Sequence, residues 1–117
     1  MPTSLEIAGV ETPEQVQFNS LMLQLTGDRK CSSYPAVYGA YLALQRSVTH
    51  KGKKLILYPN VPIARLFDID EDPHEMKDLA KDGKNLDLQK SLFAQLLDLQ
   101  EETGDTLDLK AKFPKLL

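Results

Sequence analysis

The sequence predicts an α+β domain in which three to four helices cover a small sheet of about three short strands. Two kinds of pattern predict this class. Apolar residues recur at helical spacing in several segments, whereas residues 106–113 alternate strictly between apolar and polar side chains. A short apolar block, Leu55–Tyr58, is delimited by Gly52 and Pro59, which is typical of a buried strand. An all-α bundle with extended ends is the alternative.

Three elements are predicted in the first half of the chain. Residues 4–10 begin with an apolar–polar alternation and predict a short strand. The pair Thr12–Pro13 is a helix start signal, and a helix is predicted over 13–26. A second helix is predicted over 35–48, because apolar residues recur there every three or four positions, at Val37, Tyr41, Leu44 and Val48.

The second half of the chain contains five further predicted elements. A strand buried on both faces is predicted over 55–58, followed by a helical turn within 60–67. A cap-plus-proline signal predicts a short helix over 73–83. A wide leucine stripe predicts a long helix over 87–102, and the alternation over 106–113 predicts a half-buried edge strand.

Length and composition indicate one globular domain spanning residues 1–117. No apolar run approaches the length of a membrane span, and the first residues lack the basic and apolar regions of a signal peptide. The single cysteine cannot form an internal disulfide, which fits a reducing compartment. We therefore expect a cytoplasmic protein without membrane contact.

Charge is unevenly distributed, with a basic segment ahead of an acidic one. Residues 46–67 contain five basic and no acidic residues, whereas residues 68–117 contain thirteen acidic and seven basic ones. Clustered cations beside a glycine predict a possible phosphate or nucleic-acid contact through Arg46, His50, Lys51, Lys53 and Lys54. The competing hypothesis is a solvated corner between a helix and a strand. The absence of recognised nucleic-acid signatures favours the corner.

The acidic segment invites comparison with a calcium loop. The three aspartates within 68–72 have the 1-3-5 ligand spacing, but Pro73 stands where the loop needs glycine and Leu79 where it needs glutamate. His74 and Asp78 lie four residues apart, and two ligands do not make a site. We expect no metal site and no cofactor.

Cys31 follows two basic residues, Arg29 and Lys30, and this setting can lower the pKa of a thiol. Nucleophilic catalysis would also need a base, and nothing in the sequence places His50 or His74 beside Cys31. No serine elbow, phosphate-binding glycine loop or dinucleotide fingerprint occurs. The sequence therefore predicts a protein that is not an enzyme, with Cys31 as an accessible and dispensable loop thiol.

The helix predicted over 87–102 carries more leucines than one core stripe requires. Such a surplus is often buried by a partner chain. We therefore predict a small, non-catalytic interaction module, an adaptor or regulator, that binds a protein partner or itself as a homo-oligomer. The contacts are expected from Leu92, Phe93, Leu96 and Leu97. The alternative is a nucleic-acid-binding accessory protein that uses the basic turn over 46–54.

Overall fold

The structure, a computed structural model, describes residues 1–28 and 32–117. The chain forms two compact units, Met1–Pro35 and Ala36–Leu117. The elements confirm the α+β class, although the sheet is antiparallel and has four strands instead of about three. No helix within the described residues is long and apolar enough to cross a membrane. A single domain over the whole chain stays a prediction.

The first unit contains two short helices, α1 (Pro2–Ile7) and α2 (Met22–Leu25). The strand predicted over 4–10 is wrong because the described part of this unit has no other strand to pair with, and a helix satisfies its own backbone groups. The helix predicted over 13–26 is reduced to α2. An isolated helix depends on burying its apolar stripe, and Leu25 is 69% exposed.

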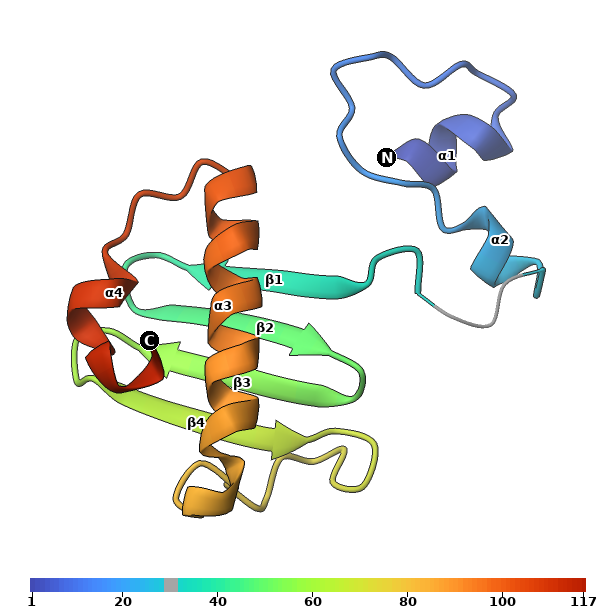
Figure 1. Ribbon diagram of the computed structural model, residues 1–117. Helices are drawn as coiled ribbons and strands as arrows, with labels where there is room; N and C mark the ends of the chain where they lie inside the picture. The colour runs from blue at the N-terminus through green and yellow to red at the C-terminus, as the bar shows by residue number, and fades with distance from the viewer. Residues whose placement is uncertain (29–31) are drawn as a thin grey trace. The chain divides into compact units, whose positions relative to one another are not determined.

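The second unit is built on a four-stranded antiparallel sheet in the order β1-β2-β3-β4 (Figure 1). Its strands are β1 (Ala36–Tyr41), β2 (Gln45–His50), β3 (Lys53–Tyr58) and β4 (Ile63–Asp68). The strand predicted over 55–58 is confirmed as the main part of β3. It is buried on both faces, since the consecutive residues Leu55, Ile56 and Leu57 are at most 5% exposed.

The helix predicted over 35–48 is instead the hairpin of β1 and β2. The residues of its supposed apolar stripe are not buried together, since Val37 is 53% and Tyr41 is 61% exposed. Burial in β2 follows the two-residue period of a strand, and the fully buried Val48 pairs with Tyr38. The four-residue spacing of apolar side chains was therefore a coincidence within two alternating strands.

Two further helical predictions are wrong. The turn predicted within 60–67 contains most of β4, whose backbone is paired with β3. Residues 73–83 form turns instead of a helix because carboxylates in this segment accept hydrogen bonds from the backbone. Asp72 accepts one from the backbone N–H of Lys77 at 2.7 Å, and Asp78 accepts two more. Such contacts compete with helix formation.

The edge strand predicted over 106–113 is also wrong. This segment holds the helix α4 (Leu109–Lys112), which is followed by a 3-10 turn, η2 (Pro114–Leu116). The carboxylate of Asp108 caps α4 by accepting a hydrogen bond from the backbone N–H of Ala111 at 3.0 Å. The side chains that become buried have helical spacing, namely Leu109, Phe113 and Leu116.

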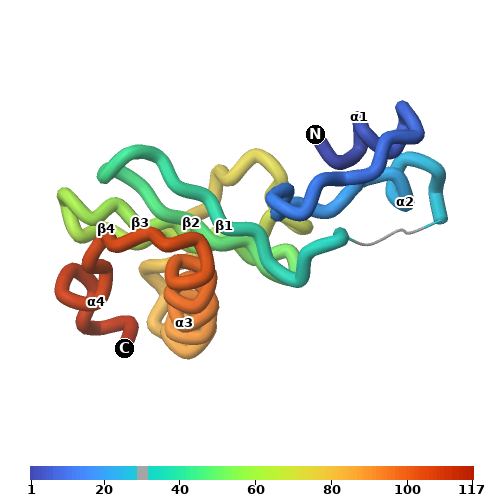
Figure 2. The backbone as a smooth tube through the Cα atoms, turned by 90° about the horizontal axis from the view of Figure 1, so that it is seen from above, coloured from blue at the N-terminus to red at the C-terminus, as the bar shows by residue number. Residues whose placement is uncertain are grey.

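The core lies between the sheet and the long helix α3 (Leu86–Glu102), which confirms the helix predicted over 87–102. Figures 1 and 2 show α3 and α4 on the same face of the sheet. Leu92, Phe93 and Leu96 are at most 2% exposed, so the predicted partner-binding side chains belong mainly to this core. Leu97 is half-buried and packs against the core. Self-association would need another surface and stays a prediction.

The turn between β2 and β3 consists of Lys51 and Gly52, both with positive φ, at 46° and 70°. Two such residues form the tight hairpin turn whose twist matches that of the flanking strands. A Cβ atom at Gly52 would lie 1.8 Å from a carboxylate oxygen of Asp70. The basic turn is therefore a hairpin end in the sheet, not a corner between a helix and a strand.

Candidate functional site

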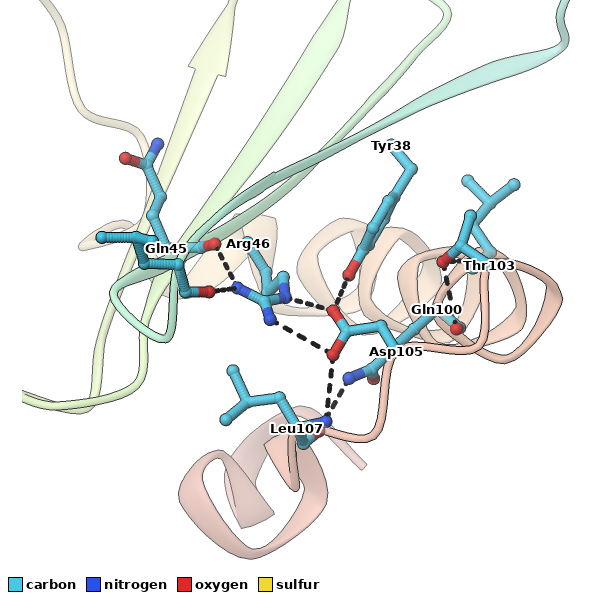
Figure 3. A network of polar contacts seen from close by, with 9 residues as sticks. Tyr38, Gln45, Arg46, Gln100, Thr103, Asp105 and Leu107 are labelled. Carbon is cyan, nitrogen blue, oxygen red and sulfur yellow. Dashed lines mark hydrogen bonds and ion pairs between the residues drawn. The ribbon is translucent and has the colours of Figure 1, made fainter. Parts of the chain in front are cut away.

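A network of polar side chains connects the sheet to the loop between α3 and α4 (Figure 3). Asp105 in this loop accepts hydrogen bonds from the Tyr38 hydroxyl and from Arg46 Nε. It also accepts them from Arg46 Nη2 at 3.2 Å and from the backbone N–H of Leu107 at 3.0 Å. The side chains of Arg46 and Asp105 are only 7% and 17% exposed. This is the most buried ion pair among the described residues.

Arg46 also closes the hairpin of β1 and β2. Its Nη1 atom donates hydrogen bonds to the backbone carbonyls of Leu42 at 2.6 Å and Gln45 at 2.8 Å. Leu42 has a φ of 47°, which is uncommon for a leucine and favours a turn held by outside contacts. One guanidinium thus holds both the hairpin turn and the loop that carries Asp105.

The network keeps its groups in their usual charge states around neutral pH. The hydrogen bonds from Arg46 hold the pKa of the Asp105 carboxyl well below its usual range. The hydrogen bond to Asp105 raises the pKa of Arg46 further. Burial, followed by the hydrogen bond to Asp105, raises the pKa of Tyr38 to about 12. A general acid or base needs a pKa near the operating pH, so this network is suited to structural support.

The other cations of the predicted phosphate contact do not form one basic surface. Lys53 pairs with Asp68, and Lys54 Nζ lies 2.6 Å from Glu75 Oε1. The hydrogen bond from Lys53 also lowers the pKa of Asp68. With Arg46 bound to Asp105, three of the four fixed cations between residues 46 and 54 are paired. Lys51 is exposed at the hairpin turn, and His50 lies at the end of β2.

The remaining predicted candidates offer no assembled chemistry. No group of three or more His, Cys, Asp or Glu side chains in the described part of the chain could hold a metal ion. The aspartates considered for calcium instead cap turns and pair with Lys53. The prediction for Cys31 falls outside the described residues.

Sequence reasoning missed Asp105, and it considered Tyr38 only as a stacking face near the basic turn. Arg46 was noticed only as one member of a basic run. Asp105 lies 59 residues from Arg46 and 67 from Tyr38 along the chain, so no local spacing pattern links them. Only the packing of the α3–α4 loop against the β1–β2 hairpin brings the three side chains together.

Comparison with known proteins identifies the class to which this fold belongs. Residues 1–102 match the family described as N-sulphoglucosamine sulphohydrolase, C-terminal. The match covers most of the chain, and the chain therefore belongs to this sulfatase C-terminal family. A search of curated protein sequences found no match.

Solved structures of sulfatases share the fold. The chain is 29% identical to BT1596, a 2-O GAG sulfatase, with a TM-score of 0.74 over 89% of this chain and 24% of that one. A putative sulfatase from Bacteroides thetaiotaomicron is 26% identical, with a TM-score of 0.75 over 95% of this chain and 27% of that one. BT4656, solved with its substrate D-glucosamine-2-N,6-O-disulfate, is 28% identical, with a TM-score of 0.71 over 93% of this chain and 24% of that one. The chain thus spans about a quarter of the length of these proteins.

These matches correct two predictions. The predicted adaptor or regulatory module is wrong, because the chain belongs to a sulfatase C-terminal family and its structural relatives are sulfatases. The prediction that the protein is not an enzyme is contradicted by the same matches to sulfatases. The error arose because sequence reasoning looked for catalytic motifs within a segment that corresponds to only about a quarter of each related enzyme.

Proposed function

We propose that this chain acts as the C-terminal domain of a sulfatase that removes sulfate from a sulfated sugar. The observation that carries the proposal is the family match over residues 1–102, supported by TM-scores of 0.71–0.75 with three sulfatase structures. The family description names N-sulphoglucosamine, and two of the related structures are described with a 2-O GAG or a sulfated glucosamine. A sulfated amino sugar or a glycosaminoglycan is therefore the proposed substrate class.

The role proposed for this chain within the enzyme is structural support instead of bond cleavage. Hydrolysis of a sulfate ester or sulfamate needs a nucleophile and electrostatic stabilisation of the departing sulfate. The described residues bring no three metal-ligating side chains together, and their most buried ion pair has pKa shifts that favour permanent charge. The cleavage chemistry is accordingly assigned to the part of the enzyme that corresponds to the other three quarters of the relatives.

A domain graft tests this proposal. The segment of the 2-O GAG sulfatase that aligns with this chain is replaced by residues 1–117, and sulfate release is measured with a 2-O-sulfated disaccharide. A second graft, carrying the aligned segment of the putative Bacteroides thetaiotaomicron sulfatase, is the matched control because its identity to this chain is similar. We expect activity from both grafts and none from the enzyme that lacks the segment.

Two outcomes would count against the proposal. A graft that is folded, as judged by a cooperative thermal transition, yet inactive while the control graft is active would refute the assignment as a sulfatase domain. Sulfate release by the 117-residue chain alone would refute the division of labour, because the chemistry would then lie within this chain.

A further inference from the structure

The second unit contains a cavity of about 530 Å3 at the start of α3. Its walls come from four places: the start of β4, the turn that precedes α3, the first turn of α3 and the segment from α4 to η2. The apolar part of the lining includes Pro62, Ala64, Leu86 and Phe113. The volume lies within the range of about 300–1,000 Å3 that is typical of small-molecule sites.

Three cations line this cavity, namely Lys81, Lys112 and Lys115. None of the described residues in its lining is acidic. All three lysines are exposed, and within the described residues none of them belongs to an ion pair. They differ in this respect from Lys53 and Lys54, whose charges are neutralised by acids. The cavity lining therefore holds three cations and no acid among the described residues.

The wall of the cavity adds polar features that favour an anion. Leu86 is the first residue of α3, a helix of 17 residues whose N-terminal end carries partial positive charge. Asp87 lies in the same turn but does not line the cavity. Gln89, 5% exposed, lines the cavity and donates a hydrogen bond to the backbone carbonyl of Ala80 at 3.2 Å. This contact joins the helix to the preceding turn, so both walls are held in place.

We propose that this cavity binds a sulfate group, either carried by a sugar or as the free ion. The three lysines would contact the sulfate oxygens, and the apolar wall would contact the C–H face of a sugar ring. The choice of sulfate rests on the proposed function, whereas the volume and the charge of the cavity do not. The site would hold a sulfated substrate segment or the released product, without taking part in bond cleavage.

The test is an NMR titration of the complete 117-residue chain, labelled with 15N. The probes are N-sulphoglucosamine, inorganic sulfate and N-acetylglucosamine, the last being a neutral sugar of similar size. We expect saturable shifts of the amide signals of Leu86, Phe113 and Leu116 with the two sulfate-bearing probes and none with N-acetylglucosamine. Tighter binding of N-sulphoglucosamine would assign the site to a sugar, and equal binding would assign it to the free ion.

Matched variants decide whether the lysines are responsible. The double substitution Lys112→Gln/Lys115→Gln should weaken sulfate binding roughly tenfold, because two exposed charge contacts are lost. The control Lys84→Gln/Lys110→Gln removes the same charge from exposed lysines that do not line this cavity, and should change affinity less than about twofold. Thermal transitions of both variants verify that they are folded.

Three results would overturn the proposal. The amide signals show no saturable shift with either sulfate-bearing probe, or they shift equally with N-acetylglucosamine. The third result is that the two double variants bind sulfate with equal affinity. Each of these outcomes leaves the graft experiment unaffected, since an active graft needs no binding at this cavity. An inactive graft together with sulfate binding here would instead retain the site and reject the sulfatase assignment.

Discussion

Replacing Asp105 with alanine is the sharpest perturbation of the second unit. The substitution removes the acceptor of four hydrogen bonds and leaves the Arg46 guanidinium buried without an opposite charge. An unpaired buried charge is costly because it loses its water shell without gaining an opposite charge. We therefore expect a large loss of stability, although no apolar packing is removed.

The structure limits the size of this loss. Breaking a buried ion pair by removing one partner costs about 3–5 kcal/mol. Arg46 keeps two carbonyl acceptors, and the Asp105 side chain is 17% exposed, so we expect about 3 kcal/mol, at the lower end. For a unit of this size, the loss corresponds to a fall in Tm of more than about 10 °C.

Urea unfolding followed by far-UV circular dichroism measures this loss. The control is Asp98→Ala, which removes an exposed acid from α3 and should stay within about 0.5 kcal/mol of the wild type. The double variant Arg46→Met/Asp105→Leu should be more stable than Asp105→Ala, because neither charge is then left unpaired. A loss below about 1 kcal/mol for Asp105→Ala would refute the argument that this ion pair holds the loop to the sheet.

Three other predictions test the same packing. Because the folded pKa of Tyr38 is raised to about 12, above the unfolded value near 10, its contribution to stability is complete below pH 10 and is lost as the pH rises toward 12. Thermal unfolding should therefore show a smaller loss of stability at alkaline pH for Tyr38→Phe than for the wild type. Equal losses in the two proteins would contradict the raised pKa of Tyr38. In urea unfolding, Leu96→Ala should lower the free energy of unfolding by about 2–5 kcal/mol, because Leu96 is fully buried. Leu97→Ala should lower it less, because Leu97 is half-buried. Equal losses would place both side chains in the core. Gly52→Ala should lower Tm through its positive φ and its clash with Asp70, and adding Asp70→Ala should recover part of the loss; no recovery would show that φ alone is responsible.

Local patterns predicted two elements correctly, and the physical reason is the same for both. The strand over 55–58 and the helix over 87–102 belong to the most heavily buried strand and helix among the described residues. Most of their buried side chains are apolar, with Gln89 and Gln100 as polar exceptions in α3, so the apolar pattern is dense. The α+β class was predicted from the whole order of elements, including the strand over 106–113 that proved wrong. It is confirmed because a central strand and a long amphipathic helix need each other to bury their apolar faces.

The hairpin of β1 and β2 shows where local patterns failed. Its apolar residues satisfy a helical spacing as well as a strand alternation, and the choice was made by pairing with β3, which lies outside the segment. The same holds at the C-terminus, where α4 formed because Asp108 could cap it and the core accepted Leu109 and Phe113. Both outcomes depended on surfaces that no window of the sequence contains.

The sequence by itself determined the central strand and the long helix, because these depend on composition and spacing within a single segment. Only the tertiary structure decided which charges meet. Arg46 appeared as one cation in a basic run, and folding buried it against Asp105, 59 residues away. Lys81 and Lys112 appeared as scattered surface charges, and folding placed both around one cavity. Distant side chains become neighbours only when the chain closes on its core, so neither site could be derived from local sequence patterns.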